Sequence, residues 1–152
     1  MENRLITELA NFTTPHLADG CMLARIPVRC APPEIGPIEA RWRCAGSARP
    51  AQHLGSIDVF LEALGHAAPG EVLVIDNGGR RDEACIGDLV VLEAEKADIA
   101  GIVIWGLHRD STELREIGLP VFSLGATPLG PQRLDARPAE VFTSPGSVLI
   151  PS

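Results

Sequence analysis

The sequence predicts an α/β fold built around a largely parallel β-sheet. Three short apolar runs, at residues 71–76, 100–105 and 121–124, have the length and the Val, Ile and Leu content of buried strands. Two stretches with apolar residues at helical spacing lie between them, at residues 82–98 and 111–117. Because strands and helices alternate with short connections, we expect parallel pairing with right-handed crossovers.

Length and composition favour one globular domain over residues 1–152. Hydrophobic residues make up 45% of the chain, enough for a core and too many for a disordered protein. The formal net charge of −7 argues against nucleic-acid binding through a basic surface. No apolar run reaches the roughly 18 residues of a membrane span, and no secretory signal pattern opens the chain. We therefore expect a cytoplasmic protein that binds neither membrane nor nucleic acid.

The N-terminal third is predicted to contain two helices, a loop and a strand. Residues 3–12 carry apolar side chains at helical spacing, and Thr14 followed by Pro15 has the N-cap and first-turn chemistry of a second helix. Residues 25–36 are rich in proline and favour a loop. Residues 38–44 alternate apolar and polar side chains, which is the period of a half-buried strand.

Capping and turn residues bound the central elements. Ser56 is expected to cap a helix that presents apolar residues at positions 59, 60, 61 and 64. Pro69-Gly70 predicts a turn into the first apolar strand. Gly118 and Pro120 are expected to end the helix at 111–117.

The C-terminal residues are predicted to form β structure. Val141–Thr143 and Ser147–Ile150 flank Ser144-Pro145-Gly146, which has the composition of a turn. The apolar side chains of residues 148–150 would be exposed on a monomer. We therefore expect an oligomer in which this tail covers a neighbouring subunit.

Two connections between these elements carry the candidate functional residues. Gly87-Asp88 precedes a helix, and Arg109-Asp110 follows the second apolar strand. The first connection offers the amides of Leu89 and Val90, which have no acceptor within the helix. The second offers a guanidinium beside a carboxylate. Should the two connections converge, they would form a pocket suited to a small anionic substrate held against a divalent metal.

Each of these residues also has a purely structural interpretation. Asp110 and Glu113 have the spacing of a capping box, with Asp110 as N-cap and Glu113 at the third helical position. Arg109 could be a surface arginine in an ion pair, and Gly87-Asp88 an ordinary helix start. On the residues alone, capping by Asp110 is favoured over metal binding.

Other chemistry-bearing residues carry weaker signals. His108-Arg109-Asp110 matches the kinase catalytic tripeptide, but the other kinase motifs are missing and the chain is too short for that domain. His108 could carry a proton beside the site, although an exposed loop histidine is the favoured interpretation. The Gly78-Gly79 turn lacks the spacing of a nucleotide-binding loop. The four cysteines form no C-x-x-C pair, so we expect reduced thiols in or just below the core.

These segments together resemble the RraA-like family. The resemblance runs from about Thr13 to about Ile150, and it is carried by residues 72–79, 86–88, 101–106 and 109–110. It implies the swivelling β/β/α fold, a layered mixed sheet with helices on one side, and assembly as a homotrimer or a hexamer. Family members usually continue into a further strand, so we expect a C-terminally short member.

The resemblance also implies an activity. Part of the family consists of divalent-metal-dependent class II aldolases, lyases that cleave 4-hydroxy-4-methyl-2-oxoglutarate or a similar 4-hydroxy-2-keto acid to pyruvate. By this likeness, Asp110 would bind Mg²⁺ or Mn²⁺, Arg109 and Asp88 would be catalytic, and the substrate would contact Gly87, Asp88, Leu89, Val90 and Arg109. The same enolate chemistry would extend to oxaloacetate decarboxylation. Because no lysine falls at the matched positions, a Schiff-base mechanism is not expected.

A non-catalytic function is the alternative. The family also contains the regulator of ribonuclease E activity, and the acidic surface of this chain would suit docking on a basic protein partner. The regulator branch departs from the Gly-Asp and Arg-Asp pairs, and this chain keeps both, which favours the aldolase. A degenerate homologue that binds keto acids and turns over poorly is a third possibility.

Overall fold

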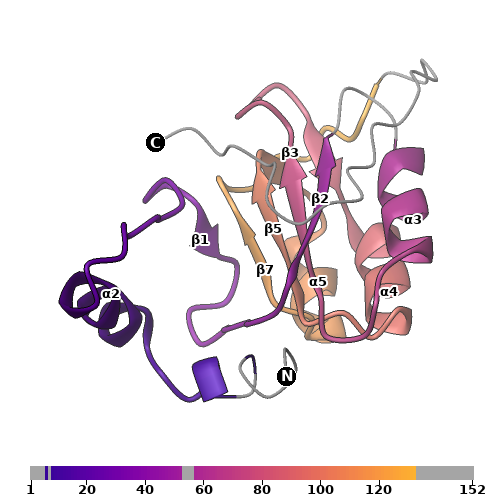
Figure 1. The fold of residues 1–152 in the computed structure, drawn as a ribbon. Helices are drawn as coiled ribbons and strands as arrows, with labels where there is room; N and C mark the ends of the chain where they lie inside the picture. The colour runs from indigo at the N-terminus through magenta and orange to yellow at the C-terminus, as the bar shows by residue number, and fades with distance from the viewer. Residues whose placement is uncertain (1–5, 7, 53–56, 133–152) are drawn as a thin grey trace.

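The computed structural model describes residues 6, 8–52 and 57–132, and a five-stranded mixed sheet lies at its centre (Figure 1). The strands lie in the order β1-β7-β5-β3-β2. Their bounds are β1 Gly36–Pro37, β2 Ala48–Gln52, β3 Val72–Asp76, β5 Gly101–Trp105 and β7 Val121–Ser123. The last four are mutually parallel, whereas β1 is antiparallel at the edge. The predicted α/β class with parallel pairing is confirmed.

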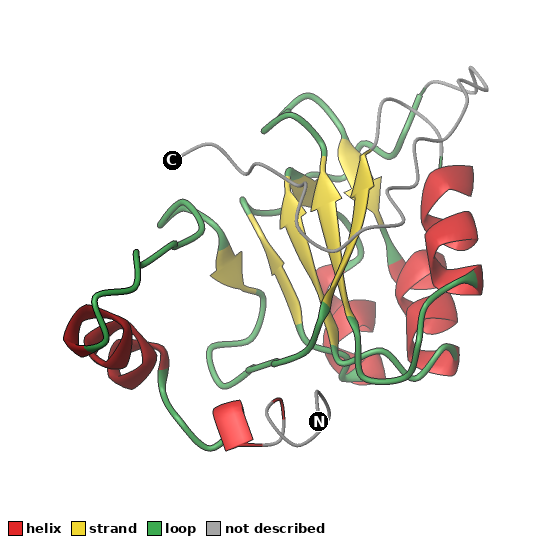
Figure 2. Cartoon of the chain, in the orientation of Figure 1, coloured by secondary structure: helices red, strands yellow, loops and turns green. Residues whose placement is uncertain are grey.

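Three helices pack on one side of this sheet (Figure 2). They are α3 Asp58–Gly65, α4 Asp88–Lys96 and α5 Ser111–Ile117, and α4 contacts both of the others. Their apolar side chains close over the continuous apolar runs of β3 and β5. Phe60 and Leu114 from the helices are fully buried with Leu73, Ile102 and Ile104 from the strands. The layered arrangement agrees with the swivelling β/β/α fold.

A second, two-stranded sheet leads directly into the candidate residues. It pairs β4 Ala84–Ile86 with β6 Leu107–His108 in parallel. The predicted helix at 82–98 is therefore wrong at its start: residues 84–86 are strand, and the helix begins at Asp88. Both Cys85 and Ile86 are fully buried, and an apolar triplet of this kind fits a short strand as well as a helix.

The strand predicted at residues 38–44 is wrong. Trp42 donates its backbone N–H to the carbonyl of Glu39 at 2.9 Å, which is a turn rather than an extended chain. Ile38 and Trp42 nevertheless pack against the core, so the alternating pattern reports burial and not backbone conformation. The missed strand in this region is β2, whose Ala-Arg-Pro-Ala-Gln sequence has little β propensity; its Pro50 is tolerated because β2 is an edge strand.

Helix α2, Thr14–Leu23, lies apart from the sheet (Figure 1). Its N-cap is Thr13 rather than the predicted Thr14, and Pro15 sits in the first turn as expected. Within the described residues α2 has no buried side chain, and Met22 and Leu23 are 70% and 87% exposed. The loop expected at 25–36 is present and ends in β1.

Several expectations fall wholly or partly outside the described residues. These are the first predicted helix at 3–12, the cap at Ser56 and the β segments at 141–150. The position before α3 is occupied by Ile57, and Leu61, one of its four predicted apolar positions, is exposed. Among the described helices, none has the length and apolar character needed to cross a bilayer.

Candidate active site

The two candidate connections meet in the structure, as the sequence predicts. Strands β4 and β6 run parallel, so the residues that follow each strand emerge at the same end. The N–H of Arg109 donates to the carbonyl of Ile86 at 3.0 Å. The N–H of Asp88 donates to Asp110 Oδ2 at 3.3 Å. A short parallel ladder that sequence analysis missed is therefore what brings the Gly-Asp and Arg-Asp pairs together.

Arg109 presents a partly fixed guanidinium at this junction. Its Nε lies 3.2 Å from Asp110 Oδ2, and its side chain remains 40% exposed. On the other side the guanidinium packs on Gly130, where an added Cβ would clash with Nη1 and lie 3.1 Å from Cζ. One edge of the planar guanidinium is thus held by the protein, while its remaining N–H groups can reach a ligand from solvent.

Asp110 does not form the capping box that its sequence suggests. Its backbone is left-handed, with φ 58° and ψ 41°, and within the described residues its side chain makes no capping hydrogen bond. The carboxylate turns instead toward the Asp88 amide and Arg109, both of which approach Oδ2. Among the described residues no hydrogen bond reaches the other oxygen, Oδ1, and the side chain is 32% exposed. The capping box predicted as the structural role of Asp110 is therefore not formed.

The donor set at this junction fits a hard divalent cation with one protein ligand. In the described part of the chain, no three His, Cys, Asp or Glu side chains form a ready-made metal cage. Mg²⁺ does not need one, because it commonly keeps several waters and takes one or two carboxylates. The partly exposed Asp110 carboxylate, whose Oδ1 accepts no hydrogen bond within the described residues, is a side chain of the type that could serve as such a ligand.

The start of α4 is less open to a ligand than the sequence suggests. The Leu89 N–H, expected to be free, donates to Asp88 Oδ1 at 2.8 Å. Val90 is also in the first turn, where the helix itself supplies no acceptor for the N–H. The Leu89 side chain is 68% exposed at the mouth of this region, whereas Val90 is buried. A substrate would therefore have to compete with Asp88 for the Leu89 amide, and the Val90 amide belongs to a buried residue.

Gly87 is required by space rather than by backbone conformation. Its φ of −143° is accessible to any residue, but a Cβ would collide with Asp110 Oδ2 and lie 2.9 Å from Arg109 Nε. Both atoms belong to the candidate site. The glycine therefore lets the β4–α4 connection close onto the Arg-Asp pair.

Gly87→Ala is expected to lower activity by about tenfold or more without unfolding the protein, because the methyl group must push Arg109 and Asp110 out of position. The measurement is substrate turnover alongside thermal unfolding. Gly65→Ala is the matched control, since a Cβ there meets nothing within 4 Å. Unchanged turnover in Gly87→Ala would show that the close packing has no functional role.

His108 is not the exposed loop histidine that the sequence favours. It lies in β6 with 4% exposure, and its ring nitrogens lie 2.7 Å from Ser123 Oγ and 2.8 Å from Ser111 Oγ. Burial lowers the pKa of His108 below its usual range, so the neutral ring is favoured. The imidazole borders a cavity of about 320 Å³ between β1, β7 and α5 whose lining includes none of residues 87, 88, 109 and 110. No sequence signal marks this serine–histidine–serine contact.

The remaining motifs have structural roles. Gly78 and Gly79 both have positive φ, 64° and 66°, and Gly79 packs against the Trp105 indole. Cys85 is buried, which raises its pKa to about 12 and leaves the thiol unreactive. Cys30 departs from expectation because it is exposed, and all four cysteines are free.

Known sequences place this chain among RraA-like proteins. The model of the RraA-like family (Aldolase/RraA) matches residues 14–149. A Burkholderia mallei protein named "Putative 4-hydroxy-4-methyl-2-oxoglutarate aldolase" is 34% identical over 139 residues, which cover 90% of this chain and 82% of the relative. A Shewanella oneidensis protein of the same name is 34% identical over 89 residues, 59% of this chain and 54% of the relative. The matched region thus spans about half the length of the latter.

Solved structures give the same grouping. Streptomyces coelicolor RraAS2, described as an unusual member of the RNase ES inhibitor RraA family, aligns with a TM-score of 0.73 at 27% identity over 84% of this chain and 66% of that one. The RNA-processing inhibitor RraA of Thermus thermophilis aligns with a TM-score of 0.68 at 25% identity, covering 82% and 75%. With the family match over most of its length, its layered fold and its paired Gly-Asp and Arg-Asp connections, the chain belongs to the RraA-like (Aldolase/RraA) family.

Proposed function

We propose that this protein is a divalent-metal-dependent aldolase-type lyase that releases pyruvate from a 4-hydroxy-2-keto acid resembling 4-hydroxy-4-methyl-2-oxoglutarate. One observation carries the proposal: the partly exposed guanidinium of Arg109 and carboxylate of Asp110 meet the start of α4 where β4 and β6 end. A 2-keto acid presents two adjacent oxygen functions, a carboxylate and a carbonyl, that this set of groups can bind. The names of the curated relatives support the same substrate class.

Asp110 would hold the cation, Mg²⁺ or Mn²⁺, through Oδ1. When bound, such an ion supplies Lewis-acid stabilisation of the negative charge that develops on the keto acid. Arg109 would contribute to the same stabilisation through the guanidinium N–H groups that do not contact Asp110. The contacts of Arg109 with Asp110 and Gly130 hold the guanidinium in place before substrate arrives, which limits the reorganisation needed during the reaction.

Asp88 is the candidate proton acceptor. Its Oδ1 is hydrogen-bonded to the Leu89 N–H, which fixes the carboxylate at the start of α4 and leaves Oδ2 for a water molecule. Through that water it would accept the proton of the substrate 4-hydroxyl. The C3–C4 bond then breaks, its electron pair forms the enolate of pyruvate, and C4 becomes a carbonyl in the second product. Protonation of the enolate at C3 yields pyruvate. Loss of CO₂ from oxaloacetate forms the same enolate, so decarboxylation is a further proposed activity.

A pyruvate-release assay tests this proposal directly. The purified protein is incubated with 4-hydroxy-4-methyl-2-oxoglutarate or oxaloacetate in Mg²⁺ and, separately, in EDTA. We expect pyruvate in Mg²⁺ and none above the uncatalysed rate in EDTA. Absence of pyruvate with both substrates in Mg²⁺ and in Mn²⁺ would contradict the lyase, and equal rates in EDTA would contradict metal dependence.

A non-catalytic regulator is the second candidate, and the solved relatives described as inhibitors of RNA processing favour it. The net charge of −7 would suit a basic protein surface as partner. The two functions place different requirements on residues 87–90 and 109–110. The lyase needs them as a binding site for substrate and metal, whereas a docking protein does not. Calorimetric titration with pyruvate and Mg²⁺ separates them: the lyase is expected to bind, and the regulator is not.

We also propose that the protein works as a homotrimer or a hexamer. Helix α2 supports this, because none of its described residues is fully buried within the subunit, while Met22 and Leu23 at its end and Ile26 just after it expose apolar surface. Light scattering is expected to give a mass that is a multiple of the 16.2 kDa chain. Leu23→Asp should shift the mass toward the monomer, whereas Thr14→Asp, at the other end of the helix, should not. A stable wild-type monomer whose activity survives dilution would contradict this assembly.

A further inference from the structure

A loop that follows β7 controls one side of the Arg109 guanidinium. Gly130 packs so closely on Arg109 that even a single added carbon would clash with Nη1. Residues 129–132 form neither helix nor strand, so no ladder of their own holds Gly130 in place. The position of this segment, and with it the space open to Arg109, must be set by contacts from elsewhere in the fold.

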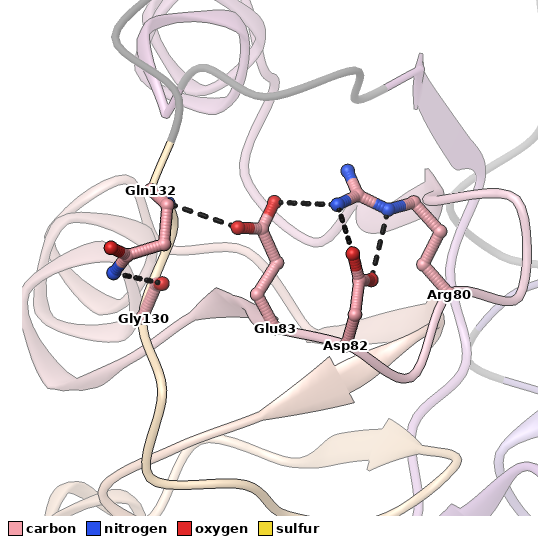
Figure 3. A network of polar contacts seen from close by, with 5 residues as sticks. All are labelled: Arg80, Asp82, Glu83, Gly130 and Gln132. Carbon is pink, nitrogen blue, oxygen red and sulfur yellow. Dashed lines mark hydrogen bonds and ion pairs between the residues drawn. The ribbon is translucent and has the colours of Figure 1, made fainter.

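Two consecutive residues at the entry to β4, Glu83 and Ala84, supply those contacts, and Figure 3 shows the one made by Glu83. The N–H of Ala84 donates to the Leu129 carbonyl at 2.7 Å, just before Gly130. Glu83 Oε2 accepts the N–H of Gln132 at 2.9 Å, just after it. Gln132 in turn donates its side-chain amide to the Gly130 carbonyl at 3.2 Å. The segment is thus anchored on both sides of the residue that touches Arg109.

Glu83 is unusual because its charge is buried. The residue is 4% exposed, and a carboxylate at such a depth needs compensation. Arg80 provides it through an ion pair, with Nη2 3.0 Å from Glu83 Oε1. Within the described residues this oxygen accepts no hydrogen bond. Arg80 also holds the exposed Asp82 through two hydrogen bonds, at 2.7 and 3.0 Å, so its guanidinium is fixed even without Glu83 (Figure 3).

We propose that Glu83 is a positioning residue for Arg109, acting through the backbone of residues 129–132. The inference rests on the proposed function, since it concerns the arginine that would bind the keto acid. Because Glu83 directly precedes β4 and Ala84 is its first residue, the β4 segment contributes to both halves of the site. Its carboxyl end carries Gly87 and accepts the Arg109 N–H, and its start holds the loop that confines the Arg109 side chain.

The mobility of Arg109 gives a test that does not depend on turnover. The Nε–H signal of Arg109 is assigned by its loss in Arg109→Lys, and its ¹⁵N relaxation is measured in the full chain. In Glu83→Ala we expect the order parameter to fall from the rigid range to below about 0.6. Asp82→Ala is the matched control, because Asp82 pairs with the same Arg80 and is 67% exposed; its Arg109 signal should not change.

A second variant keeps the proposal testable if Glu83→Ala does not fold. Gln132→Pro removes the N–H that Glu83 accepts and also the side-chain amide that donates to the Gly130 carbonyl, so it should mobilise Arg109 in the same way. An unchanged Arg109 order parameter in the folded Glu83 or Gln132 variant would overturn the proposal. This outcome is independent of whether the wild-type protein releases pyruvate.

A double-mutant cycle then separates positioning from general stability. In the wild-type background, Glu83→Ala is expected to reduce kcat/KM by about tenfold to a hundredfold. In the Arg109→Lys background the same change should have little further effect, because the two residues act through one contact. Additive losses in the cycle would show that Glu83 acts elsewhere, and would likewise overturn the proposal.

Discussion

Asp110→Asn is expected to abolish Mg²⁺-stimulated pyruvate release while the fold persists. Asparagine keeps the size of the side chain and tolerates the left-handed backbone at this position, where φ is 58°. It loses the negative charge that a hard cation requires of its single protein ligand. Since no side-chain cap is formed here among the described residues, the substitution removes no helix cap. The loss should therefore lie in binding and turnover rather than in stability.

Two measurements check this expectation. Turnover is compared in Mg²⁺ and in EDTA, and Mn²⁺ binding is followed by electron paramagnetic resonance in the absence of substrate. Asp110→Ala should show the same functional loss with an added cost of about 1 kcal/mol in the free energy of unfolding, because alanine is strained in the left-handed region. Full activity in Asp110→Asn, or undiminished Mn²⁺ binding, would remove Asp110 from the metal site.

Arg109→Lys is expected to lower kcat/KM by about a hundredfold or more, although the charge is conserved. In the structure one edge of the guanidinium faces Asp110, and the fork rests on Gly130. Its remaining N–H groups stay directed outward. A lysine ammonium is a single point charge, so it can satisfy Asp110 or reach a substrate oxygen but cannot hold both with a planar fork.

The control for Arg109→Lys is an arginine that binds a carboxylate away from the site. Arg49, near the start of the edge strand β2, binds both oxygens of Glu71, at 2.8 and 2.9 Å. Arg49→Lys should cost stability without changing kcat/KM. A near wild-type kcat/KM in Arg109→Lys would show that Arg109 is an ordinary surface arginine. The lyase proposal would then lose the positively charged side chain that is expected to bind the substrate.

Strands β3, β5 and β7 and helix α5 could be predicted because their sequences report their surroundings directly. Continuous apolar runs arise where a strand is covered on both faces, and Gly118, at φ 83°, ends α5 where a left-handed residue is needed. The apolar pattern led to wrong predictions at residues 38–44, where a strand was expected, and at residues 84–86, where a helix was expected. There, short apolar stretches satisfy burial equally well in a turn, a strand or a helix, and only tertiary contacts select among them.

The sequence by itself determined the family, the α/β class and the two connections that carry Gly87-Asp88 and Arg109-Asp110. Residue type and spacing are local properties, so they can be read from the sequence without knowledge of the fold. Tertiary structure alone decided how the carboxylate of Asp110 is used, that Gly87 must lack a side chain, and that Glu83 holds the loop against Arg109. These depend on distances between segments 20 to 50 residues apart, roughly the separation of β4 from β6 and of Glu83 from Gln132. Such distances are set by the parallel pairing of β4 with β6 and by the buried charge of Glu83. Neither feature produces a hydrophobic period in the sequence, so neither could be predicted from it.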